Sequence, residues 1–365
     1  MPKPFPMRTK VCRIHSLAAG VIFLGLCLAA LGTPEPRRTS AWVKPAVETG
    51  KLDSAELSEG SGLIASRQNP GVLWVHNDSG DRARIFAINE KGQLLAEYTL
   101  PGAVAVDWEE ISFGPGPGTG DYIYVGDIGD NGLNRDGQAH YTKKIKRDEV
   151  RAFPAFFRFS EPKVPKGIPP DPAQAPRREV RDWERIELRY PDDKPYNCEA
   201  FTIDRTTGDA FLFVKNHVAG DPEKFGRVFL ATARQIEIAS KTKTPVRLKL
   251  AAKVRTNRDS TRPALATAAD LSADGKILMV KNIQEVFVWV RHGNENWEER
   301  LREEPEAPFH LPIAIGDTFT QPGIGEAIGL TPDSRSFYTL KEGKYVPLWR
   351  WEFTDAFWAR MAEFH

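Results

Sequence analysis

A recurring phrase constrains this chain more than any other feature of its sequence. Five times along 365 residues, a polar residue opens a short alternating strand, a turn follows, and a second strand rich in β-forming residues ends in a polar pair. Turn residues between two such strands are the signature of a β-hairpin. The five copies begin at Ser61, Glu109, Glu199, Thr267 and Glu326. Repetition of this kind predicts an array of similar β units.

Further β-rich segments follow three of the hairpins and bring those units to four strands. They span residues 84–88 and 94–100, then 228–231 and 246–250, then 286–290 and 297–301. Four antiparallel strands make one blade of a β-propeller. We therefore predict an all-β fold over residues 39–365, a single β-propeller domain of five blades, or six if residues 140–190 hide a degenerate unit. A sandwich of two sheets is the alternative.

The last predicted unit lacks a fourth strand, because the chain ends soon after VPLWRWEF. We expect residues 42–52 to supply it, so that the two ends of the chain pair and close the ring. Residues 160–180 are Pro-rich and polar without an apolar period, which predicts a surface insertion. Near the end, Thr354 is predicted to cap a short helix.

The first 38 residues have the composition of a targeting segment. Basic residues precede an apolar run at residues 17–31, and a Pro-rich stretch follows it. An apolar run of about 15 residues suits a secretory signal better than a membrane span, and a retained membrane anchor is the alternative. We therefore predict a periplasmic or extracellular protein, anchored to the membrane if the signal is kept. Its exported domain keeps only Cys198, which excludes an intramolecular disulfide.

Charge limits the class of partner. The first 38 residues hold six Lys or Arg and one Glu, so the remaining chain carries 44 basic and 48 acidic residues. A mildly acidic domain without a basic block argues against nucleic acid as a partner. We expect a small molecule, a glycan or an envelope protein instead.

The repeat predicts a polar rim around a central channel. If each phrase is the innermost hairpin of a blade, the start of its first strand and the end of its second lie on the same rim. Glu at matched strand starts is not explained by turn or strand preference. Hard oxygen ligands of this kind suit Ca²⁺. The predicted metal ligands are Glu109, Asp127, Glu199, Asn216, Asn282 and Glu326. Salt bridges between rim Glu and Lys residues are the alternative reading.

Two loops extend this rim with further oxygen ligands. HNDSGD at residues 76–81 and GDIGDN at residues 126–131 interleave carboxylates and amides with Gly. Neither has the spacing of a helical calcium loop, and ordinary Asx turns would also explain them. The predicted ligand-binding residues here and nearby are Asn77, Asp78, Asp81, Asp130, Asn131, Asp270 and Glu342.

Two classes of function fit this rim. In the first, the protein is a binding module that uses the rim to hold its ligand. In the second, it is a metal-dependent hydrolase of an ester, lactone or phosphoester, in which Ca²⁺ polarises the substrate oxygen. His76 would then act as general base, and Lys215, Lys281 or Lys341 would stabilise the developing negative charge. The sequence favours the binding module slightly over the enzyme.

The same residues resemble a known family. The runs SGLIASRQNPGVLWVHNDSGD, VDWEEISFGPG and YVGDIGDN resemble an uncharacterised family of secreted bacterial β-propeller proteins. The later runs CEAFTID, TGDAFLFVKN, TAADLSADGK and GEAIGLTPD extend the resemblance over residues 55–350. It implies the propeller fold and an exported setting.

A more distant resemblance concerns the rim. The layout is similar to the six-bladed superfamily of senescence marker protein-30, gluconolactonases and paraoxonases, in which Glu, Asn and Asp hold Ca²⁺ at the channel mouth. The residues that match in type are Glu109, Glu199, Asn216, Asn282 and Glu326. The resemblance implies a calcium site, and a lactonase reaction only by analogy of fold.

Overall fold

The computed structural model describes residues 40–130, 153–194, 196–215, 225–257, 265–311 and 325–363. The chain divides into two units, residues 1–36 and 37–365, and the described residues all belong to the second. The predicted targeting segment, residues 1–38, thus lies outside them. Within the described ranges, no helix is both long and apolar enough to cross a membrane.

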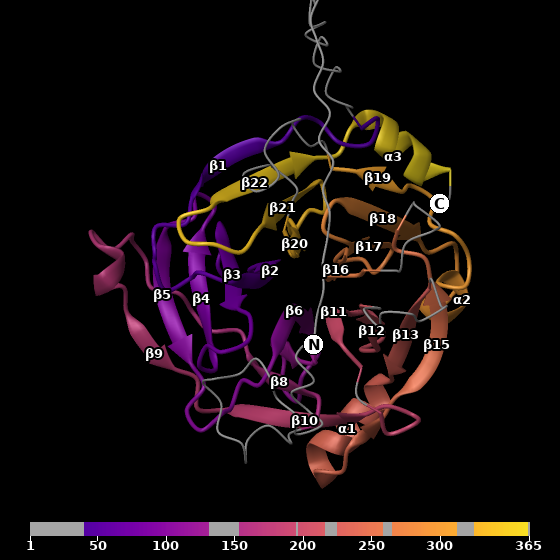
Figure 1. Ribbon diagram of the computed structural model, residues 1–365, viewed down its shortest axis with the longest axis horizontal. Coiled ribbons are helices and arrows are strands. Elements are labelled where there is room, and N and C mark those ends of the chain that lie inside the picture. The colour runs from indigo at the N-terminus through magenta and orange to yellow at the C-terminus, as the bar shows by residue number, and fades with distance from the viewer. Residues whose placement is uncertain are drawn as a thin grey trace, which may run out of the picture. The chain divides into compact units, whose positions relative to one another are not determined.

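Five small sheets surround a common centre, with strands β2, β6, β11, β16 and β20 innermost (Figure 1). The first contains β2 (Gly60–Ala65), β3 (Val72–Asn77), β4 (Arg84–Asn89) and β5 (Leu94–Thr99). The second contains β6 (Trp108–Gly114), β7 (Tyr122–Asp127), β8 (Ala155–Ser160) and β10 (Trp183–Arg189). The third contains β11 (Cys198–Ile203), β12 (Ala210–Val214), β13 (Gly226–Ala231) and β15 (Lys249–Val254).

The remaining two sheets complete the ring. The fourth contains β16 (Ala268–Leu271), β17 (Ile277–Lys281), β18 (Glu285–Val290) and β19 (Phe309–His310). The fifth contains β20 (Ala327–Leu330), β21 (Ser336–Leu340), β22 (Pro347–Glu352) and β1 (Val47–Lys51). The predicted β-propeller of five blades is confirmed, and neither a sandwich nor a sixth blade is formed by the described residues.

The ring closes through the two ends of the domain, as the sequence predicts. β1 pairs antiparallel with β22, and Val47 lies opposite Arg350. An isolated bridge between Val43 and Phe353 continues this pairing. The fifth sheet thereby joins strands from both ends of the domain, and β1 is its outermost strand.

Two predicted strands are wrong. The fourth strand of the third blade is β15, residues 249–254, whereas residues 246–247 form β14, which pairs in parallel with β10 of the second blade. Residues 297–300 form helix α2 (Trp297–Arg300) instead of a strand, because Asn296 and Glu299 make a capping box at its start.

The described residues form two other α-helices. Helix α1 (Ala233–Thr242) follows β13 and begins at a capping box made by Thr232 and Gln235. Helix α3 (Asp355–Ala362) begins after Thr354, whose side chain accepts from the Phe357 N–H as predicted. The Phe357 ring stacks on Phe353 at 4.0 Å between centroids, which docks α3 on the fifth blade.

The Pro-rich segment of residues 160–180 lies against the first blade, although it follows β8 of the second. The Glu161 carboxylate accepts from Trp74 Nε1 at 2.8 Å and from the Gln68 N–H at 3.0 Å. After the short 3₁₀ helix η2 (Pro172–Gln174), β9 (Arg177–Glu179) pairs in parallel with β5. The segment thus covers the outer edge of the first blade.

The core lies between neighbouring blades. Four fully buried tryptophans, one in each of four blades, are Trp74, Trp108, Trp289 and Trp351. Trp74 and Trp108 belong to one cluster that joins the first two blades. Because each sheet is covered on both faces by its neighbours, the inner strands form a rigid frame that positions the channel residues.

Candidate functional site

Local irregularities in two inner strands aim glutamates at the channel rim. The pairing register of β6 shifts between Trp108 and Glu110, and that of β11 shifts between Cys198 and Ala200. Glu109 and Glu199 are therefore the extra residues of β-bulges, which re-aim a side chain out of the regular alternation. The Glu that begins the repeat phrase at these two positions is thus the bulge residue at the start of the inner strand.

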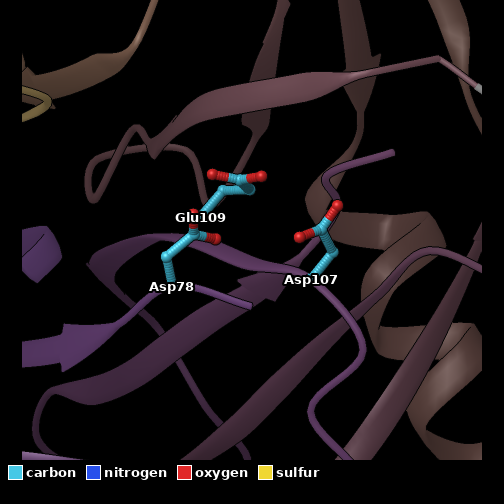
Figure 2. A group of neighbouring side chains, drawn as sticks. All are labelled: Asp78, Asp107 and Glu109. Carbon is cyan, nitrogen blue, oxygen red and sulfur yellow. The ribbon is translucent and has the colours of Figure 1, made fainter. Parts of the chain in front are cut away.

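Glu109 lies in a first cluster of three acidic residues, the Asp78–Asp107–Glu109 cluster. Asp78 follows β3, and Asp107 directly precedes β6. Their carboxylate oxygens and that of Glu109 all lie within 4.8 Å of one another. Figure 2 shows the three side chains, with Asp78 on one stretch of the chain and Asp107 and Glu109 on another. The arrangement gathers the hard oxygen ligands that divalent cations prefer.

The backbone around Asp107 supports this cluster. The Asp107 N–H donates to Asp127 Oδ1 at 2.9 Å, and its carbonyl accepts from the N–H groups of Ile128 and Gly129 at 3.1 Å. A Cβ atom at Gly129 would lie 2.0 Å from Glu109 Oε1 and 2.7 Å from Asp107 Oδ2. A glycine is therefore needed there to leave room for the carboxylates.

The same Glu109 also belongs to a second cluster, the Glu109–Glu199–Glu326 cluster, whose carboxylate oxygens again lie within 4.8 Å of one another. Lys215, which follows β12, forms salt bridges to both Glu199 and Glu326. The distance from Lys215 Nζ to Glu326 Oε1 is 3.4 Å. The second cluster thus includes a positively charged side chain, the ammonium of Lys215.

Burial makes these charges costly. Glu109 is only 1% exposed, and its Oε1 atom has no hydrogen-bond partner among the described residues. Burial, followed by the charges of Asp78 and Glu199, raises the pKa of Glu109 well above its ordinary value. Burial likewise raises the pKa of Asp78 well above its ordinary value, and that of Glu199 to about 7. A bound cation would offset the unfavourable burial and mutual repulsion of these negative charges.

Three of the six predicted metal ligands, Glu109, Glu199 and Glu326, meet at the rim. Asp127 instead accepts from the N–H groups of Val106 and Asp107, which fixes the chain before β6. Asn282 accepts from the N–H groups of Gln284 and Glu285 and caps its own turn. These two side chains hold backbone in place, and Asn216 lies outside the described residues.

The two predicted loops contribute less to the clusters than their composition indicates. Asp78 reaches the first cluster. Asn77 accepts from the N–H groups of Ser58 and Glu59 and donates to Asp81, which pairs with Arg84. Both therefore stabilise the first blade.

In the second loop, the backbone N–H of Asp130 donates to Asn197 at 2.7 Å, and the Asp130 side chain is buried. Asn131 lies outside the described residues. Asx-type turns and local contacts account for most of the described polar residues in these loops.

Three predicted site residues are buried and contact backbone groups. His76 is fully buried, its Nδ1 lies 2.9 Å from the Asn77 carbonyl oxygen, and burial lowers its pKa to about 4. Lys281 donates to three backbone carbonyls, those of Asn282, Ile283 and Gly325. Asp270 accepts from the N–H groups of Leu271 and Leu330. All three side chains thus contact nearby backbone groups.

Two further predicted residues follow β21. Lys341 is half-buried, and Glu342 is exposed. Although Glu342 is solvent-exposed, neighbouring atoms partly desolvate its carboxylate, and this desolvation, followed by the nearby charge of Glu326, raises the pKa of Glu342. Glu342 thus adds to the negative potential of the rim without joining either cluster.

Sequence reasoning misses two acidic residues. Asp107 completes the first cluster, and Glu110 lies in the channel, where its carboxylate accepts from the N–H groups of Ile111 and Ala269 at 3.0 and 2.9 Å. The signal was the run VDWEE, which places three acidic residues within four positions at the start of one inner strand. A bulge in that strand separates Glu109 from Glu110.

Two solved structures show a weak similarity to the chain. No family model and no curated protein matches the chain. A solved structure of hydrazine synthase from Kuenenia stuttgartiensis is 10% identical, with a TM-score of 0.35, over 78% of this chain and 68% of that one. The β-propeller domain of Cps50 (Swd1) from Myceliophteria thermophila is 10% identical, with a TM-score of 0.43, over 85% of this chain and 100% of that one. The predicted resemblance to secreted bacterial propellers remains a prediction beyond the fold.

Proposed function

We propose that the protein is an exported ligand-binding propeller whose channel rim binds Ca²⁺ through Asp78, Asp107 and Glu109. One observation supports this most directly: the buried Oε1 atom of Glu109 faces two further carboxylates and has no hydrogen-bond partner among the described residues. Buried polar atoms are nearly always partnered, so an orphaned carboxylate oxygen in an acidic cluster favours a cation.

Calcium fits this set of ligands better than a transition metal does. The cluster offers carboxylates alone, whereas zinc and copper prefer imidazole or thiolate. Calcium takes six to eight oxygens at flexible geometry, so that three carboxylates leave positions for water or for a ligand. A ligand oxygen that replaces such a water would make binding depend on calcium.

The binding module is preferred to the hydrolase because of the fate of the predicted base. A general base must reach the proton that it abstracts, directly or through one water. His76 is fully buried, and the ammonium of Lys281 donates to backbone carbonyls. The described rim thus offers carboxylates and Lys215, which serve recognition more readily than proton transfer.

The setting and partner follow from the sequence. The apolar run at residues 17–31 supports export to the periplasm or beyond. A mildly acidic domain in that setting would meet small molecules, glycans and envelope proteins. A glycan or a carboxylate-bearing small molecule carries the hydroxyl or carboxylate oxygens that coordinate a rim calcium.

The first test is calcium-dependent stability. A ligand that binds only the native state at a hundred times its Kd raises the free energy of unfolding by about 2.7 kcal/mol. Chelation should therefore lower the Tm of the wild type, and Glu109→Gln should abolish the response. Glu110→Gln is the matched control, because Glu110 is the next residue on the same strand and is also buried. An unchanged Tm on chelation, with no metal found by elemental analysis, would contradict the proposal.

The second test separates binding from catalysis. Panels of envelope glycans and peptides, and of lactone, aryl-ester and phosphoester substrates, are assayed with calcium and with chelator. We expect calcium-dependent binding that is lost in Glu109→Gln, without turnover. Calcium-dependent turnover that is lost in the same variant would establish the hydrolase instead.

A further inference from the structure

The second cluster differs from the first in one respect. In the Glu109–Glu199–Glu326 cluster, the ammonium of Lys215 lies between two of the three carboxylates. In the first cluster, neither Asp78 nor Glu109 accepts a hydrogen bond from a lysine or an arginine among the described residues. The two acidic clusters therefore share Glu109. Lys215 forms its salt bridges only within the Glu109–Glu199–Glu326 cluster.

The position of Lys215 is fixed by burial and by its partners. The residue is 8% exposed and directly follows β12, whose pairing with β11 brings Lys215 beside Glu199. An ammonium group has three donors, and Glu199 and Glu326 take two of them. As a compact point charge among carboxylates, the ammonium occupies the kind of position that a metal ion would take.

Some metal centres hold two ions at neighbouring positions. Their ions lie about 3.5 to 4 Å apart and act together on one ligand. Here one carboxylate, Glu109, belongs to both clusters, and in each cluster one oxygen from each residue lies within 4.8 Å of the others. Such a shared carboxylate is placed to bridge two cations.

We propose that Lys215 holds the position of a second divalent cation, so that the wild-type rim binds one ion and the rim without this ammonium binds two, bridged by Glu109. The inference rests on the proposed calcium site at the Asp78–Asp107–Glu109 cluster. Removing Lys215 leaves two buried carboxylates, those of Glu109 and Glu199, and the partly exposed carboxylate of Glu326 without a counter-charge, which is unfavourable. A second calcium ion restores the balance.

The experiment counts calcium ions. Wild type and Lys215→Met are titrated with calcium by calorimetry, and the number of bound ions is checked by native mass spectrometry. We expect Lys215→Met to bind one more ion per chain than the wild type. Lys215→Arg keeps the charge and should bind the wild-type number. Lys276→Met is the matched control, because Lys276 is an exposed lysine of a turn on the fourth blade.

Each other outcome counts against the inference. An equal number of ions in Lys215→Met and wild type overturns it. A wild type that already binds two rim ions, one lost in Glu199→Gln and the other in Asp78→Asn, also overturns it. If Lys215→Met is unfolded in chelator, calcium should refold it, and failure to refold at saturating calcium is a negative result. A wild type that binds no ion refutes the proposed calcium site itself.

Discussion

Glu109 and Glu110 are neighbours in the sequence, and both carboxylates are buried, yet they belong to different regions of the molecule. Glu110 lies in the channel interior and accepts two backbone N–H groups, one of which comes from β16 of the fourth blade. Glu109 lies on the rim, and its Oε1 accepts none from the described residues. Burial raises the pKa of both well above the ordinary value. The difference shows that hydrogen-bond partners, more than burial, separate a structural carboxylate from a candidate ligand site.

The largest difference between the two carboxylates should appear when each is removed in turn. Glu110→Ala leaves two buried N–H groups unpaired, at a cost of roughly 1–3 kcal/mol each, so the free energy of unfolding should fall by about 2–6 kcal/mol. Glu109→Ala removes a repelled charge, so without calcium it should change stability little or increase it. Urea unfolding in chelator measures both. An equal loss in the two variants would show that rim and interior do not differ in this way.

The fold was largely predictable because its signal is repeated. Each hairpin phrase is weak alone, but five copies with matched polar starts leave few architectures that bury them all. The closing strand was also predictable, because the last unit lacked a fourth strand that the N-terminal side of the domain could supply. The errors fell on the outer strands of the blades, where Asn296 starts a helix in place of a strand and residues 246–247 pair with another blade.

The site was predictable in type more than in membership. Glu at three strand starts, which neither turn nor strand preference explains, indicated the residues Glu109, Glu199 and Glu326 that lie together in the structure. The role of Asp127, which fixes the backbone of Asp107, was not visible in the sequence, because Asn and Asp serve turns and ligands equally well. Nor could spacing reveal that a bulge divides Glu109 from Glu110, since one residue of register decides which way a side chain points.

The pH dependence of stability should also distinguish the two regions. Burial raises the folded-state pKa of Glu199 on the rim from 4.5 to about 7, so the stability that this group contributes is present below pH 4.5 and is lost as the pH rises through 7. The full shift corresponds to about 3 kcal/mol. In the interior, His76 has its pKa lowered from 6.5 to about 4, so its contribution is lost as the pH falls through that window.

The two contributions partly cancel in the wild type, so a difference between variants is needed. Urea midpoints at pH 5 and pH 7.5 in chelator should show that Glu199→Gln loses stability less steeply than the wild type as the pH rises. His76→Gln should change the slope in the opposite direction. Identical slopes in all three proteins would mean that neither group titrates in the folded state as its burial requires. Adding calcium should reduce the pH dependence of stability that comes from Glu199 and leave the pH dependence that comes from His76 unchanged.

The substitution Gly129→Ala tests whether the rim cluster needs the space that Gly129 leaves. A Cβ atom in Gly129→Ala would lie 2.0 Å from Glu109 Oε1, so the carboxylate must move away from Asp107. Altering a group that positions metal ligands typically weakens binding tenfold to a hundredfold, and here we expect calcium affinity to fall on the order of tenfold. Calorimetry measures the affinity, and urea unfolding in chelator checks that the fold is intact. The backbone conformation of Gly129 is one that alanine also adopts, because its φ is not positive. Undiminished calcium affinity in a folded Gly129→Ala would place the ion elsewhere than at Glu109, whereas equal losses of affinity and of stability without calcium would show that the glycine serves the fold and not the site.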